Sequence, residues 1–103
     1  MKNDVAESVK QCITEIEPSA TIFLYGSHCR VDCAKGIDWD FLILVDGTVD
    51  SARADRLRHA IYRIASLSLA KVNAVIKCRA DWEAEKEKNI PLYKRISKEG
   101  IEL

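Results

Sequence analysis

The stretch GIDWDFLILV, residues 36–45, contains the most apolar segment of the chain and has two aspartates near its start. Beyond Asp40 the segment is apolar at every position, which is typical of a central strand covered on both faces. Asp38 and Asp40 are two residues apart, so in a strand their side chains point the same way. Aspartate is depleted in strands. The stretch therefore predicts a central strand over residues 37–45 that carries a pair of carboxylates at its beginning.

Length and composition indicate one compact domain. The 103 residues suffice for one core, and no repeat or linker divides them, so we expect a single domain over residues 1–103. Sixteen basic residues balance sixteen acidic ones, so the net charge does not favour nucleic-acid binding, although an RNA acceptor stays open. No apolar signal segment or membrane-length run is present. We therefore expect a cytoplasmic protein with reduced cysteines and no membrane association.

Apolar periodicity and turn signals predict the elements around this strand. Helices are expected over residues 4–17, 50–69, 82–89 and 92–99, and strands over 20–25, 37–45 and 71–77. Asp81 is expected to cap the third helix, and Gly100 to end the fourth as a C-terminal glycine. Arg53 is expected on the solvated side of the second helix. The predicted fold class is α/β (α+β), with a small mixed β-sheet flanked by helices.

The connections between the predicted strands bring distant polar residues together. The second and third strands are joined through a helix, which favours a parallel pair with a right-handed crossover. The first and second are joined without a helix, which favours an antiparallel pair. The end of the first strand then meets the starts of the other two. Gly26-Ser27, Asp38, Asp40 and Asn73 are therefore expected at one edge of the sheet.

The chemistry of these residue types favours a cation and a phosphate. Asp38 and Asp40 offer the carboxylate oxygens that Mg²⁺ prefers, and substrate phosphates commonly complete such a site. A glycine after a strand permits close approach of a ligand, and the N–H and hydroxyl of Ser27 can hold a phosphate oxygen. The alternative is a pair of solvent-facing aspartates at a frayed strand start, beside an ordinary Gly-Ser turn.

A zinc site is a further alternative for the loop between the first two strands. His28, Cys29 and Cys33 could supply three ligands, but a fourth would have to come from His59 or a distant cysteine.

The segment LYGSHCRVDCAKGIDWDFLILV resembles the signature of minimal nucleotidyltransferase domains of the polymerase-β superfamily. That signature is a hydrophobic strand, Gly-Ser, an arginine two residues later, a short loop, and Asp-x-Asp leading into a second apolar strand. The ending IPLYKRISKEGIEL also resembles the C-terminus of these domains. The matching positions are Gly26, Ser27, Arg30, Asp32, Asp38, Trp39 and Asp40. The resemblance implies a nucleotidyltransferase-like fold over nearly the whole chain.

The resemblance implies a Mg²⁺-dependent enzyme that transfers a nucleotidyl group, often AMP from ATP, to a hydroxyl. It places Asp38 and Asp40 on the metal, and Gly26 and Ser27 on the triphosphate, with Arg30 at the edge of the nucleotide site. It also implies a small helical partner of the HEPN type, as in toxin–antitoxin pairs. Formation of a homo-oligomer stays open.

The chain departs from the signature at the position of the third carboxylate. The best match there is Asn73, which coordinates a metal weakly and cannot act as a base. The second hypothesis is therefore a nucleotide-binding or partner-binding subunit with little catalysis. Asp32 is a weaker candidate for the missing carboxylate. Trp39 points away from the carboxylates and is expected in the core, and Tyr25 and Tyr93 are expected to pack there as well.

Overall fold

The computed structural model of the chain describes residues 4–25, 39–68, 71–86, 88 and 90–103. Their elements follow in the order α1 (Asp4–Ile16), β1 (Thr21–Tyr25), β2 (Trp39–Val45), α2 (Ser51–Ser68), β3 (Val72–Cys78), α3 (Arg79–Lys86), α4 (Pro91–Glu99) and β4 (Ile101–Glu102). The fold is a mixed α and β arrangement, as predicted.

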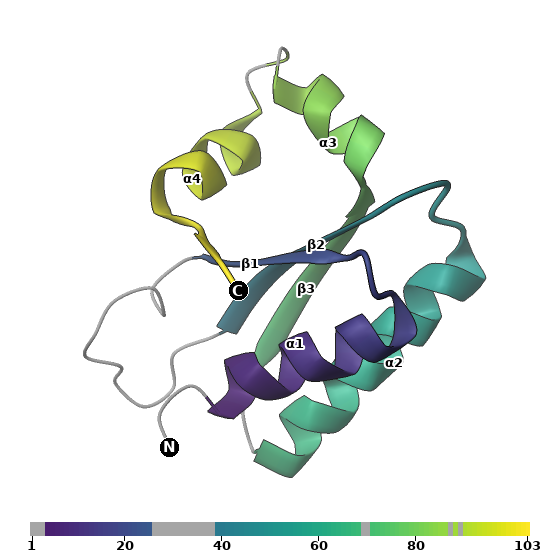
Figure 1. Cartoon of the computed structure of the whole chain (residues 1–103). Helices are drawn as coiled ribbons and strands as arrows, with labels where there is room; N and C mark the ends of the chain where they lie inside the picture. Colours follow the sequence, from purple (N-terminus) through teal and green to yellow (C-terminus); the bar gives the residue numbers. More distant parts are fainter. Residues whose placement is uncertain (1–3, 26–38, 69–70, 87, 89) are drawn as a thin grey trace.

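The four described strands form one mixed sheet in the order β3-β2-β1-β4. β1 pairs antiparallel with β2, and β2 pairs parallel with β3, so both predicted pairings are confirmed. α2 connects the two parallel strands (Figure 1). The sequence did not predict β4, which pairs antiparallel with β1 through residues Ile101 and Glu102. β1 is thus an inner strand of the sheet.

The sheet lies between two pairs of helices, with α1 and α2 against one face and α3 and α4 on the other (Figure 1). Alternate side chains of β2 pack on opposite faces of the sheet. Phe41 and Ile43 pack with α1 and α2, whereas Leu42 and Leu44 pack with α3 and α4. Three of these four side chains have no exposed surface, and the fourth, Leu44, is 4% exposed. This confirms the prediction of a central strand covered on both faces.

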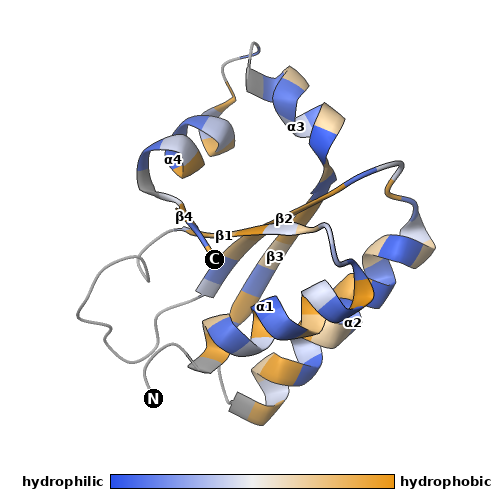
Figure 2. Cartoon of the chain, viewed as in Figure 1, coloured by the Kyte–Doolittle hydropathy of each residue, from blue (hydrophilic) through white to orange (hydrophobic). Residues whose placement is uncertain are grey.

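The two long helices bury the faces that their sequences predict. Val9 and Ile13 of α1 meet Leu57 and Ile61 of α2 in one core cluster, and all four side chains are fully buried. Both helices combine hydrophilic and hydrophobic residues, as expected of helices with one buried face (Figure 2). None of the described helices has the length and apolar composition needed to cross a membrane.

The start of α3 and the end of α4 differ from the predictions. α3 begins at Arg79, directly after β3, so Asp81 lies in its first turn and does not precede the helix as a cap. The Asp81 backbone N–H donates to the half-buried Cys78 Sγ at 3.4 Å. Gly100 ends α4 as predicted, but in extended backbone (φ −68°, ψ 144°) and not in the left-handed conformation. A Cβ there would lie 2.6 Å from the Ile96 carbonyl oxygen, so close approach is what requires glycine.

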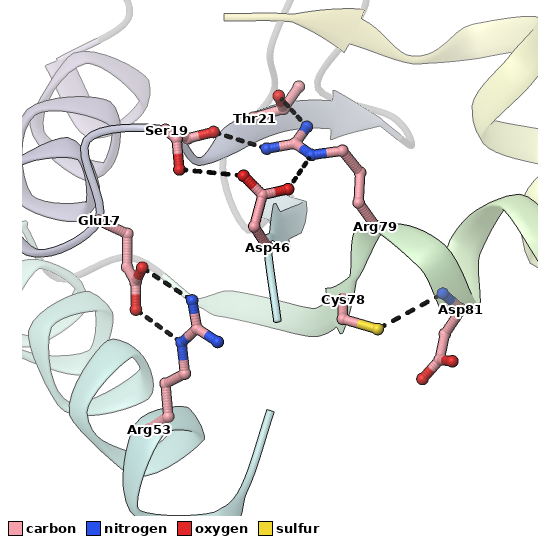
Figure 3. A network of polar contacts seen from close by, with 8 residues as sticks. All are labelled: Glu17, Ser19, Thr21, Asp46, Arg53, Cys78, Arg79 and Asp81. Carbon is pink, nitrogen blue, oxygen red and sulfur yellow. Dashed lines mark hydrogen bonds and ion pairs between the residues drawn. The ribbon is translucent and has the colours of Figure 1, made fainter. Parts of the chain in front are cut away.

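Arg53 was wrongly predicted to be on the solvated side of α2. Its guanidinium donates two hydrogen bonds to the Glu17 carboxylate, Nε to Oε2 at 2.7 Å and Nη2 to Oε1 at 2.9 Å (Figure 3). Its Nη1 also donates to the Thr48 carbonyl oxygen at 2.9 Å. Arg53 therefore joins the end of α1 to the start of α2.

A second arginine, Arg79, joins segments at the end of the sheet where β2 and β3 finish. Its guanidinium donates to Asp46 Oδ1 at 2.9 Å, to Thr21 Oγ1 at 2.7 Å and to the Ser19 carbonyl oxygen at 2.6 Å (Figure 3). The hydrogen bond from Arg79 is the main reason that the pKa of Asp46 lies below its ordinary value. Asp46 therefore has a structural partner, at the opposite end of β2 from Asp40.

Candidate functional site

Three polar side chains lie in one row across the sheet, at the end opposite to Arg79. Asp40, near the start of β2, is the register partner of Tyr25, the last residue of β1. Asp40 is also the register partner of Asn73, the second residue of β3. Register partners in neighbouring strands face the same side of a sheet, so the row lies on the face that α3 and α4 cover. The predicted meeting of the start of β2 with the start of β3 is therefore observed.

Asp40 and Asn73 are joined by a direct hydrogen bond. The Asn73 Nδ2 group donates to Asp40 Oδ1 at 3.0 Å. Asp40 is half-buried and Asn73 is exposed, so solvent reaches the pair from the edge of the sheet. The Asn73 amide is a neutral hydrogen-bond donor to the Asp40 carboxylate. A carboxylate at the same position of β3 would instead place a second negative charge beside Asp40.

This arrangement suits one hard cation better than two. Asp40 supplies a carboxylate oxygen, and Asn73 can supply its amide oxygen if the terminal amide turns to present Oδ1 in place of Nδ2. Oxygen donors of these types fit Mg²⁺. Asn73 has no proton-accepting group at neutral pH, so it can orient a ligand but cannot remove a proton from one.

Tyr25 connects this row to the helical layer above it. Tyr25 is 6% exposed and belongs to the core cluster that also contains Leu42 and Ile96. The Arg95 guanidinium of α4 lies over the ring, with Cζ 5.5 Å from the ring centroid. Burial raises the pKa of the Tyr25 hydroxyl above its ordinary value, the Asp40 charge adds to the rise, and the Arg95 charge opposes it.

The aromatic residues that were assigned to packing are confirmed in that role. Trp39 lies on the opposite face to Asp40 and stacks on Phe41, with ring centroids 6.3 Å apart and planes 8° apart. Tyr93 packs against Trp82 at 4.8 Å between ring centroids. Both residues are half-buried, and their rings pack against other aromatic side chains.

Several predicted site residues lie outside the described residues. These are the proposed phosphate-binding residues Gly26, Ser27 and Arg30, the metal ligand Asp38, and the loop candidates His28, Cys29, Asp32 and Cys33. Their assignments stay predictions from the sequence.

No group of three or more His, Cys, Asp or Glu side chains that could hold a metal ion occurs within residues 4–25, 39–68, 71–86, 88 and 90–103.

Arg95 was not predicted as a site residue from the sequence. The available signal was its position next to Ile96, the buried residue of α4. A residue beside a buried helical position lies at the border between the packed and the exposed side.

The chain was compared with protein-family models, with curated proteins and with solved structures. None of the three comparisons found a match.

Proposed function

We propose that the chain is a Mg²⁺-dependent nucleotidyltransferase that transfers a nucleotidyl group, AMP from ATP, to a hydroxyl of an acceptor. The observation that carries the proposal is the position of Asp40. Asp40 lies at the solvent-accessible start of a central strand and accepts a hydrogen bond from Asn73. It also pairs with Tyr25, the last residue of β1, after which the sequence continues into Gly26-Ser27. This placement brings a carboxylate to the strand end that leads into the predicted phosphate-binding dipeptide.

In the proposed reaction the acceptor hydroxyl oxygen forms a bond to the α-phosphorus of ATP. The bond from that phosphorus to the bridging oxygen breaks, pyrophosphate leaves with the bonding electrons, and the hydroxyl proton passes to solvent. Asp38 and Asp40 would hold Mg²⁺, and the ion would supply positive charge to neutralise phosphate oxygens and the leaving pyrophosphate. Ser27 and the Gly26 backbone would hold the triphosphate, with Arg30 at the edge of the site.

A second candidate function is favoured by the Asn73 hydrogen bond. An amide that donates to Asp40 satisfies one carboxylate oxygen without bringing a charge for a second metal. The chain would then bind a nucleotide, or a small helical partner of the HEPN type, with little transfer of its own. Such a domain fits an antitoxin-like subunit.

The test is incubation of the full chain with Mg²⁺, ATP labelled at the α-phosphate, and candidate acceptor proteins. Asp38→Asn and Asp40→Asn are each expected to reduce label transfer by about 100-fold or more, since either change removes a charged metal ligand. Asp55→Asn, at an exposed position of α2, is the matched control and is expected to retain transfer.

One outcome tests the assigned metal ligands, and another separates the two candidate functions. Equal transfer by wild type and by the two site variants would overturn the assignment of the metal ligands. Binding of ATP without transfer in the wild type, lost in both site variants, would favour the binding subunit.

A further inference from the structure

Arg95 of α4 carries a permanent positive charge and contacts the last residue of β1, Tyr25. Its guanidinium lies over the Tyr25 ring, and Tyr25 is the register partner of Asp40. Arg95 is exposed, while the residue after it, Ile96, is 5% exposed and anchors α4 on the sheet. α4 therefore fixes the base of the Arg95 side chain, and the tyrosine ring supports its charged end.

Tyr25 is the common neighbour of two opposite charges. Asp40 is its register partner on β2, and the Arg95 guanidinium lies over its ring. A cation and a carboxylate are thus both close to the end of β1. This combination suits a ligand that carries a metal ion on one side and excess negative charge on another, as a metal-bound triphosphate does.

An arginine is well suited to such a ligand. Its planar guanidinium can stack on an aromatic face and also bind phosphate oxygens in pairs. The Tyr25 ring limits the directions in which the guanidinium can point, so less conformational entropy is lost when an anion binds.

We propose that Arg95 binds the phosphate chain of the nucleotide and so determines selectivity for triphosphates at the Asp40 site. The proposal rests on the proposed function for the position of the nucleotide. Arg95 then contacts phosphate oxygens on the α4 side, while Asp40 serves the metal. Arg95 is a binding residue in this scheme and takes no part in proton transfer.

The experiment measures the binding of three probes to the full chain by titration calorimetry with Mg²⁺: ATP, inorganic triphosphate and adenosine. Arg95→Gln is expected to raise the Kd for ATP and for triphosphate by about 10-fold or more, because a charge-assisted contact is lost. The Kd for adenosine is expected to stay within about twofold, and Arg95→Lys to recover much of the triphosphate affinity.

Lys94→Gln is the matched control, since it removes an exposed cation from the neighbouring position of the same helix. It is expected to change each Kd by less than about twofold. Equal effects of Lys94→Gln and Arg95→Gln would overturn the proposal, because the loss would then reflect net charge. Lower thermal stability of Arg95→Gln with unchanged Kd values would also overturn it, because Arg95 would then serve packing alone.

Asp40→Asn distinguishes this proposal from the proposed function. If triphosphate binding requires Arg95 but not Asp40, and no label is transferred, the Arg95 site stands and the nucleotidyltransferase assignment fails. If transfer requires Asp40 while Arg95→Gln binds and transfers like wild type, the Arg95 proposal fails alone. A wild type that binds neither ATP nor triphosphate overturns both.

Discussion

At the scale of single residues, the side chain at position 73 determines the negative charge that lies beside Asp40. Asn73 donates to Asp40 Oδ1 at 3.0 Å, so the two residues are already within reach of one shared ion. An aspartate at position 73 would keep nearly the same volume and replace the donor with a negative acceptor. The pair would then repel without a cation and attract one more strongly.

If the site binds Mg²⁺ as proposed, we expect Asn73→Asp to tighten that binding by about 10-fold, because a second carboxylate attracts the cation more strongly. Where wild-type transfer is weak, the variant should increase it. The variant should be slightly less stable than wild type without Mg²⁺ and should regain stability when Mg²⁺ is added, since ligand binding to the folded state stabilises it. Thermal unfolding with and without Mg²⁺ measures both effects.

Asn73→Ser serves as the control for this prediction, because it removes the amide without adding a charge. A Mg²⁺-dependent stability gain of the same size in both variants would contradict the expected role of the added carboxylate.

At the scale of elements, the Glu17–Arg53 ion pair makes the contact between α1 and α2 sensitive to pH. The side chains are 17% and 20% exposed. The hydrogen bond from Arg53 is the main cause that holds the pKa of Glu17 below its ordinary value of 4.5. A lowered folded pKa means that the stabilisation is present above the unfolded value and is lost as the pH falls through the folded value.

Glu17→Gln is expected to reduce stability by about 1 kcal/mol at pH 7, because the pair is only partly enclosed. The difference from wild type should shrink as the pH falls below 4.5, the ordinary pKa of this carboxyl. Urea unfolding at several pH values measures it, with exposed Glu15→Gln as the control. A difference that is independent of pH would contradict the ion-pair explanation.

The two described glycines at element ends are needed for different reasons. Gly47 has a φ of 84°, whereas Gly100 has an ordinary φ and no space for a Cβ beside Ile96. Alanine is expected to cost about 1–2 kcal/mol at Gly47, through backbone strain, and about 1–3 kcal/mol at Gly100, through steric overlap.

Asparagine separates these two causes, because it tolerates the left-handed conformation better than alanine does. At position 47, asparagine should therefore cost less than alanine, and at position 100 it should cost at least as much. Free energies of unfolding of the four variants test this. An advantage of asparagine at position 100 would contradict the steric explanation.

At the scale of the whole molecule, stability depends on β2 because it contributes to the packing on both faces of the sheet. Phe41 has no exposed surface and lies in the layer of α1 and α2. Phe41→Ala is expected to cost about 3–5 kcal/mol, through lost burial and a residual cavity. Leu67→Ala, at a side chain that is 83% exposed, should stay within about 0.5 kcal/mol of wild type. Urea unfolding compares the two variants.

The sequence predicts the sheet centre well because its signals there are local and strong. The apolar run after Asp40 predicts a covered strand, and the helical or non-helical connections predict which neighbours are parallel and antiparallel. β4 was missed because two residues are too few to show any periodicity. The Arg79 contacts were missed because its three partners come from segments up to 60 residues away.

In the candidate site, too, the strand pairing could be predicted from the sequence and the helix packing could not. The approach of Asp40 to Asn73 could be predicted, since strand order alone brings the starts of β2 and β3 together. The position of Arg95 over Tyr25 could not, because it depends on how α4 packs on the sheet. No helical pattern specifies that packing direction.

The parallel pairing of β2 with β3 has a consequence for folding kinetics. Asp40 and Asn73 are 33 residues apart, and their contact requires closure of the whole crossover through α2. Contacts of this kind form late, because the entropy of a long loop is lost before the pairing is gained. A spectroscopic probe at position 73 should therefore report a late step of folding. The proposed binding of Mg²⁺ to this pair would then slow unfolding more than it speeds folding.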